Sequence, residues 1–121
     1  MPIESAYAEC ERITREQARN FAWGIRLLPQ AKRQALSAVY AFARRVDDIG
    51  DGDLPAAEKL RQLAEARAAI ADPAAYPDDP VLVALADAAR RLPIPLAAFG
   101  ELVDGCEMDV SGRSYGDLDD L

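Results

Sequence analysis

The stretch from Tyr40 to Asp53, YAFARRVDDIGDGD, decides how this chain is expected to fold. At 3.6 residues per turn of an α-helix, one narrow stripe holds Tyr40, Arg44, Asp47 and Asp51. Asp48 lies beside that stripe. The other side of the same helix is apolar and carries Ala35, Val39, Phe42, Val46 and Ile49. The stretch therefore predicts a helix with one face for the core and one acidic face that also bears an arginine and a phenol.

The acidic stripe is unfavourable for a helix on its own. Asp47 and Asp51 are like charges four residues apart, and such a pair destabilises a helix by roughly 0.2–0.5 kcal/mol. Carboxylates near a helix C-terminus also oppose the helix dipole. Mg²⁺ prefers one or two carboxylates with water and substrate phosphates, so the spacing suits a magnesium–diphosphate site. Alternatively, Gly50 and Gly52 end the helix and leave a solvated acidic turn, and spacing alone does not decide between these interpretations.

Composition favours a single all-α domain. The chain has 121 residues, 50% of them hydrophobic, and strong helix formers dominate, whereas β-branched residues never form a run. No apolar stretch reaches the length of a membrane span, and the first residues lack the pattern of a secretory signal. A cytoplasmic location is therefore expected.

Charge and residue usage exclude several classes of function. The net charge of −7 argues against nucleic acid as a partner, and an anionic ligand would need local arginines or a metal bridge. The chain has no histidine, which removes every histidine-dependent catalytic triad. Cys10 and Cys106 lack the spacing of a metal site and are expected to be reduced, partly buried core residues.

Six helices are expected in order, over about 2–13, 14–28, 29–50, 55–71, 81–92 and 95–110. Thr14 and Gln17 form a weak capping box for the second helix. In the fourth helix we expect the inward residues to be Leu60, Leu63, Ala64 and Ile70. Residues 72–80 form a proline-rich loop, 111–116 form another, and 117–121 begin a further helical turn.

Three sequence motifs occur in a defined order along the chain. They are ARNF at 18–21 followed by LLP at 27–29, AVYAFARRVDDIGD at 38–51, and GCEMDV at 105–110 followed by Tyr115 and by DLDDL at 117–121. Together they resemble the squalene and phytoene synthase family, the head-to-head isoprenyl diphosphate synthases. The middle motif is specific, because the tyrosine, the arginine and the paired aspartates fall at the family's spacing, whereas the outer two are weak alone.

The resemblance implies an all-α isoprenoid synthase fold and a transferase of isoprenoid biosynthesis. The family joins two molecules of farnesyl or geranylgeranyl diphosphate into a cyclopropylcarbinyl diphosphate, which some members rearrange further. It implies Mg²⁺ ligands at Asp47, Asp48 and Asp51, and catalytic roles for Asp47, Asp51, Arg44 and Tyr40. Substrate contacts are implied at Arg19, Phe21, Arg44 and Asp109. The resemblance is closest to bacterial presqualene diphosphate synthases, which favours farnesyl diphosphate.

The family pattern also implies what should accompany these residues. It continues into a tyrosine-containing helix and a second aspartate-rich helix, neither of which is present here. Residues 1–121 are therefore interpreted as the N-terminal part of one synthase domain, inactive unless a partner chain supplies the rest. Because the missing part would leave apolar faces exposed, we expect a homo-oligomer or a complex with a complementing C-terminal part. Besides the prenyl diphosphate, we expect peripheral association with the inner membrane through the lipid product.

Two other classes of function compete with this interpretation. A calcium-binding EF-hand loop beginning at Asp47 would place acceptable residues at several positions, namely Asp51, Gly52, Asp53 and Glu58. Its third position is Ile49, which cannot ligate through its side chain. The remaining alternative is an interaction subunit without chemistry of its own.

Overall fold

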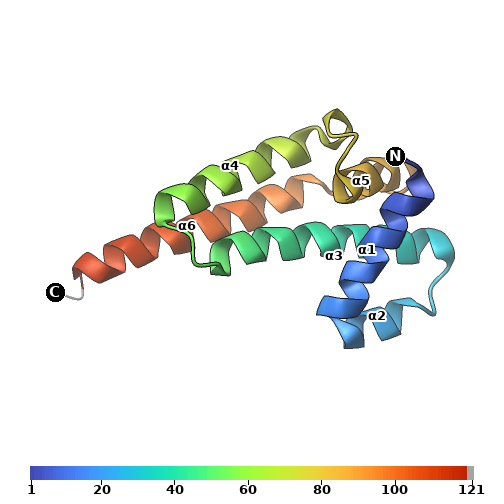
Figure 1. The fold of residues 1–121 in the computed structure, drawn as a ribbon, viewed down its shortest axis with the longest axis horizontal. Coiled ribbons are helices and arrows are strands. Elements are labelled where there is room, and N and C mark those ends of the chain that lie inside the picture. Colours follow the sequence, from blue (N-terminus) through green and yellow to red (C-terminus); the bar gives the residue numbers. More distant parts are fainter. Residues whose placement is uncertain (120–121) are drawn as a thin grey trace.

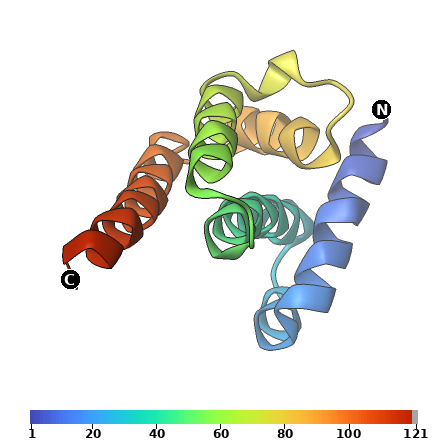
Figure 2. The same cartoon turned by 60° about the vertical axis from the view of Figure 1, so that its left-hand side comes forward.

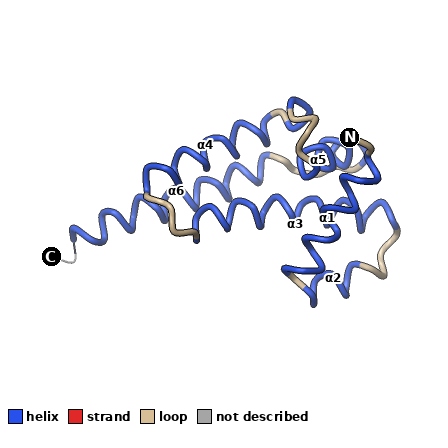
Figure 3. Tube along the Cα trace, viewed as in Figure 1, coloured by secondary structure: helices blue, strands red, loops and turns tan. Residues whose placement is uncertain are grey.

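The computed structural model describes the backbone of residues 1–119 and the side chains of residues 1–112. Its elements are, in order, α1 (Ile3–Gln17), α2 (Arg19–Ile25), α3 (Gln30–Asp51), α4 (Ala56–Ala71), the short 3-10 helix η1 (Pro73–Ala75), α5 (Pro80–Arg91) and α6 (Ala97–Asp119). Residues 1–119 contain no strand (Figure 3), so the expected all-α fold is confirmed.

Helix α3 is the central element, and all five other α-helices contact it. In Figure 1, α1 crosses α3 near one end, α5 lies beside this crossing, and α4 and α6 run along the other half. Figure 2 shows α1 and α6 on opposite sides of α3, with α4 above and α2 below. This arrangement covers the apolar face of α3 and leaves part of its other side open.

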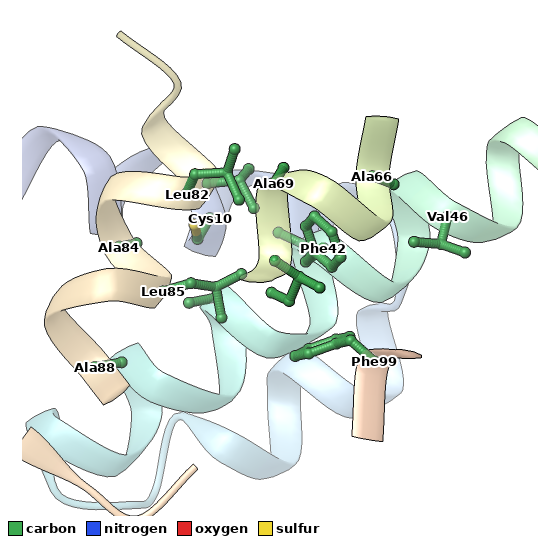
Figure 4. Close-up of a cluster of buried hydrophobic side chains, with 14 of the residues drawn as sticks. Cys10, Phe42, Val46, Ala66, Ala69, Leu82, Ala84, Leu85, Ala88 and Phe99 are labelled. Atoms are coloured by element: carbon green, nitrogen blue, oxygen red, sulfur yellow. The ribbon is translucent and has the colours of Figure 1, made fainter. Parts of the chain in front are cut away.

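The core lies on the face of α3 that the sequence predicted to be apolar. Phe42 is fully buried and meets Phe99 of α6 edge-on, with 5.0 Å between ring centroids. Around this pair, Figure 4 shows side chains from α1, α3, α4, α5 and α6. Ala35 and Val46 are also buried, whereas Val39 and Ile49 are partly buried. Burying a phenylalanine side chain contributes about 1.5–3 kcal/mol to the stability of the fold, so this contact is important for the packing of α6 against α3.

Two buried or half-buried polar contacts fix the helices around this core. The Tyr7 hydroxyl of α1 donates to Asp87 of α5 at 2.7 Å. Arg45 of α3 donates two hydrogen bonds to Asp79, at 2.7 and 2.9 Å, and Asp79 also caps the first turn of α5. Hydrogen bonds to charged groups are worth about 1.5–3 kcal/mol when well buried, so these contacts add to the apolar packing.

Of the two cysteines, Cys10 is buried and Cys106 is half-buried, which matches the expected burial. Burial raises the pKa of the Cys10 thiol to about 12. A thiol with so high a pKa is not a nucleophile at neutral pH.

The boundary between the first two helices was predicted wrongly. Helix α1 continues through Thr14 to Gln17, and the helical conformation is interrupted at Ala18. Thr14 does not cap a helix, because its buried hydroxyl donates to the Cys10 carbonyl oxygen one turn earlier, at 2.8 Å. A threonine bonded in this way stays inside a helix, which the capping pattern alone could not reveal.

Helix α6 is longer than predicted. Its backbone remains helical from Ala97 to Asp119, so the expected loop at 111–116 does not form. No proline interrupts this stretch, and each glycine in it costs only about 1 kcal/mol relative to alanine. The far end of α6 runs past α3 and α4 (Figures 1 and 3). The side chains of Tyr115 and of DLDDL lie outside the described residues.

Other predicted boundaries were close. Helix α3 follows Pro29, and α4 ends at Ala71, as the sequence indicated. Leu63 and Ile70 face inward and Leu60 is partly buried, but Ala64 is exposed, contrary to the prediction. None of the helices formed by the described residues combines the length and apolar character needed to cross a membrane.

Candidate functional site

The candidate site lies on the side of α3 that faces away from the core. We call this side the outer face and define it by Leu36, Tyr40, Arg44, Asp47 and Asp51. Asp47 and Asp51 are exposed, Leu36 is partly exposed, and Tyr40 and Arg44 are half-buried. The predicted stripe therefore exists on one helix, with carboxylates in solvent and an aromatic and a cationic group beneath them.

Helix α2 reaches the outer face through Phe21. The rings of Phe21 and Tyr40 are tilted by 31° to each other, and their centroids are 5.5 Å apart. Phe21 remains 40% exposed. Two predicted site residues from different motifs are thus brought together by the fold, and they form an aromatic surface next to the carboxylates along α3.

Arg44 is positioned between the aromatic pair and the carboxylates. Its Nη2 atom lies 3.0 Å from Oδ1 of Asp48, one turn further along α3. Such a half-exposed pair within one helix contributes about 0.3–0.5 kcal/mol. The buried Nε atom of Arg44 has no hydrogen-bond partner among the described residues. The guanidinium therefore retains a buried donor that an anionic ligand could satisfy.

The aspartates suit a hard cation by their chemistry but do not form a complete cage. Among the side chains described, no three acidic or cysteine groups converge closely enough to hold a metal ion. Mg²⁺ does not require such a cage, because it takes one or two carboxylates and completes its shell with water and phosphate oxygens. Asp47, Asp48 and Asp51 therefore fit a partial Mg²⁺ site on one wall.

A cavity of about 570 Å³ lies between α1, α2 and α3, at the Leu36 end of the outer face. Its walls include Trp23 and Ile25, and its lining is basic, with Arg15, Arg19, Arg26 and Arg33. Arg33 is paired with Glu11 at 3.0 Å. The cavity therefore combines apolar surface with arginines at a distance from the aspartates.

Ser37 is a site residue that the sequence analysis missed. It lines this cavity and is 1% exposed, and its Oγ atom has no hydrogen-bond partner among the described residues. The available signal was its position three residues before Tyr40, which puts it on the same stripe of the helix. A buried, unpaired hydroxyl costs about 1–3 kcal/mol, so a polar ligand group there would relieve it.

The two other residues predicted to contact the substrate, Arg19 and Asp109, lie away from the outer face. Arg19 lines the cavity, whereas Asp109 is exposed on α6.

The EF-hand hypothesis is wrong, because the first five positions of its loop, Asp47 to Asp51, belong to α3. An EF-hand loop needs these positions outside the helix to wrap its ligands around the ion.

Comparison with known proteins identifies the family. A sequence profile described as squalene/phytoene synthase matches residues 14–121, which include the whole outer face and the cavity residues from α2 and α3. The chain belongs to the squalene/phytoene synthase family. The family assignment predicted from the three motifs is thereby confirmed, and with it the kind of fold that the helices build.

The curated relatives that the chain matches are named phytoene synthases. Those of Mycobacterium bovis and Mycobacterium tuberculosis are each 53% identical to the chain over 119 residues, covering 98% of the chain and 39% of the relative. The 15-cis-phytoene synthase of Synechococcus elongatus is 36% identical over 120 residues, with 98% and 39% covered. The chain thus spans 39% of the length of these relatives. Their names do not confirm the expected likeness to presqualene diphosphate synthases.

Proposed function

We propose that the outer face of α3 is one wall of a site that condenses two allylic prenyl diphosphates head to head. The observation that carries this proposal is the exposed pair Asp47 and Asp51 on the same face as Arg44, in a chain of this family. Without the family assignment, the same residues would equally suit a solvated helix end.

The proposed reaction joins the two substrates with loss of one diphosphate. The C1–O bond of one molecule breaks, its C1 bonds to the C2–C3 double bond of the other, and loss of a proton closes a cyclopropane ring. Mg²⁺ supplies neutralisation of the leaving diphosphate when it is bound. Asp47 and Asp51 would hold that ion, and Arg44 would donate to the diphosphate oxygens.

The aromatic surface would protect the reacting carbons. An allylic cation reacts with any water that reaches it, so a synthase must exclude water from this position. Tyr40 lies one turn before Arg44 on α3, with the Phe21 ring of α2 beside it, and aromatic faces attract cationic groups. In this proposal they cover the reacting end of the substrate while the diphosphate stays at the carboxylates.

The cavity suits the apolar end of the substrate. Ser37 is ten residues before Asp47, which corresponds to about 15 Å along a helix. A prenyl chain with its diphosphate at Asp47 would therefore reach the walls formed by Trp23 and Ile25. Since the relatives are named after phytoene, we propose geranylgeranyl diphosphate as the substrate, in place of the farnesyl diphosphate that the sequence analysis favoured.

The proposed site needs ligands from a second segment. The proposed metal ligands Asp47, Asp48 and Asp51 all lie on α3, and the partial Mg²⁺ site they offer is too small to neutralise two diphosphates. We propose that the opposite wall comes from a complementing C-terminal segment or from a second copy of the chain. Either would also cover exposed apolar side chains of the outer face such as Leu36.

Binding of a substrate analogue tests the proposal without requiring turnover. Calorimetry with Mg²⁺ and the unreactive analogue geranylgeranyl thiodiphosphate should give binding that Asp47→Asn and Asp51→Asn each weaken about tenfold or more. The matched control is Asp53→Asn, which removes the same charge from the exposed turn after α3. Equal losses in all three variants would mean that only overall charge matters, which contradicts the proposal.

Turnover then tests the second wall. The chain is incubated with Mg²⁺ and labelled geranylgeranyl or farnesyl diphosphate, alone and together with a segment matching the remaining length of the mycobacterial relative. A cyclopropyl product only in the supplemented sample supports both the reaction and the partner. Absence of product from every sample, together with analogue binding by the chain, would leave an interaction subunit without chemistry as the better description.

We also propose contact with a lipid surface through the tip formed by α2. Trp23 and Leu27 are 61% and 74% exposed, and the Arg26 guanidinium lies 4.8 Å from the centre of the Trp23 ring. Exposed tryptophan beside arginine is typical of sites at the membrane interface. Vesicles containing anionic lipid should sediment the chain, and Trp23→Ala should abolish this. Met108→Ala on α6, where the side chain is 72% exposed, should have no effect.

A further inference from the structure

The last turn of α3 carries the aspartates in a position that should be unstable. A helix C-terminus leaves carbonyl groups without partners and has partial negative charge. Asp47, Asp48 and Asp51 add three carboxylates to this end. A cation or a donor from elsewhere in the molecule would therefore stabilise this turn when no metal is bound.

Lys59 supplies that donor from the beginning of α4. Its Nζ atom donates a hydrogen bond of 2.8 Å to the carbonyl oxygen of Gly50. Lys59 is only 8% exposed, which is unusual for lysine and costly unless the ammonium has partners. Among the described side chains, no carboxylate forms an ion pair with Lys59, so Lys59 does not occupy Asp47 or Asp51.

The position of Lys59 is not explained by α4 itself. It lies in the first turn of that helix, where the dipole disfavours a cation by about 0.3–1 kcal/mol. Its hydrogen bond to Gly50 satisfies a carbonyl group at the end of α3 instead. The same end is packed from α6, because a β-carbon added to Gly50 would lie 3.7 Å from Sγ of Cys106.

We infer that Lys59 is a positioning residue that holds the last turn of α3 helical and so keeps Asp47 and Asp51 on one face, ready for a divalent cation. This inference rests on the proposed function, because it concerns the same carboxylates. It adds a residue from another helix, outside the stretch that the motifs cover, on which metal binding depends.

The test compares Lys59→Met with Tyr7→Phe. The second variant removes the Asp87 hydrogen bond between α1 and α5 and serves as a matched control for a general loss of stability. In Lys59→Met, amide hydrogen exchange of residues 47–51 should accelerate about tenfold or more, whereas Tyr7→Phe should leave these amides unchanged. Similar exchange in the two variants would overturn the inference. Lys59→Gln retains a neutral donor and should fall between wild type and Lys59→Met.

The affinity for Mn²⁺, used as a probe for Mg²⁺, gives a second test. The two possible roles of Lys59 predict opposite changes in this affinity when the lysine is removed. A lysine that was merely nearby would repel Mn²⁺, so its removal would raise the affinity. A positioning role requires the opposite, a loss of about tenfold in Lys59→Met with no loss in Tyr7→Phe. Raised or unchanged affinity in Lys59→Met overturns the inference. If the wild-type chain binds no Mn²⁺, the proposed function fails, and the exchange comparison still decides the role of Lys59 at the turn.

Discussion

Two neighbouring arginines of α3 show how differently the two faces of this helix are used. Arg45 points toward the core side and makes two hydrogen bonds to Asp79, a residue 34 positions away in the chain. Arg44 points to the outer face, pairs only with Asp48 of its own helix, and keeps a buried Nε atom without a partner among the described residues. Of the two, only Arg44 has a buried nitrogen without a hydrogen-bond partner among the described residues.

The same contrast holds for the rest of the two faces. On the core side, Phe42 and Val46 are fully buried, and Arg45 is paired with Asp79. On the outer face, Leu36 and the carboxylates are exposed, and the carboxylates repel one another. Groups that reduce stability and remain unpaired are typical of sites for ligands, because the ligand supplies the missing interactions.

The largest difference between the faces should appear on truncating an apolar side chain. Phe42→Ala should lower the free energy of unfolding by about 3–5 kcal/mol, because it leaves a cavity beside Phe99. Leu36→Ala on the outer face should cost less than about 1 kcal/mol. Urea denaturation followed by circular dichroism measures both values. Equal losses would mean that the outer face is packed in solution, as in a dimer.

Asp87 on the core side should make stability depend on acidity. Burial raises the pKa of its carboxyl, but the Tyr7 hydrogen bond and the guanidinium of Arg91 lower it by more, so the net pKa lies below its usual range. The carboxylate therefore contributes stability above about pH 4, the ordinary pKa of aspartate, and loses it as the pH falls through the lower pKa of the folded state. Asp87→Asn should lose about 2 kcal/mol at pH 7 and respond less to acid. An unchanged acid response would contradict this assignment.

The arginine pair itself offers a smaller but more specific comparison. Arg45→Met should cost about 1–2 kcal/mol, a value reduced because the pair with Asp79 is about one-third exposed. Arg44→Met should stay within about 0.5 kcal/mol of wild type while weakening the binding of the thiodiphosphate analogue. Thermal unfolding and calorimetry together separate the two effects. If Arg44→Met lowered stability and Arg45→Met weakened analogue binding, the roles assigned to the two arginines would be wrong.

The smallest expected effect has the opposite sign. Asp51→Asn removes a like charge four residues from Asp47 and should stabilise the chain by about 0.2–0.5 kcal/mol in the absence of metal. With saturating Mg²⁺ and analogue, the wild type should become the more stable of the two, because bound ligand adds to the stability of the folded state. Melting curves with and without ligand should therefore cross over.

Much of the fold and part of the site could be predicted from the residues. The spacing of apolar and acidic residues in α3 gave both of its faces, because helical periodicity is a local property. Pro29 and Pro55 marked the starts of α3 and α4 for the same reason. The common face of the paired aspartates, Arg44 and Tyr40 could be predicted because all four residues lie within one helix.

Other features depended on contacts between distant segments. Thr14 stays inside α1, where the packing of the other helices buries its hydroxyl and this hydroxyl donates to the Cys10 carbonyl oxygen. The cavity beside Ser37 exists only because α1 and α2 pack over α3. No local pattern indicates that Lys59 would reach back to Gly50.

The sequence by itself thus determined an all-α chain of the squalene/phytoene synthase family, with a carboxylate stripe on a helix whose other side is apolar. Both follow from residues a few positions apart, whose geometry the helix fixes. Only the tertiary structure decided that Phe21 lies against Tyr40, that arginines line a cavity next to Ser37, and that Lys59 donates to Gly50 in the turn bearing the aspartates. These contacts join separate helices, and their distances depend on how the whole core packs.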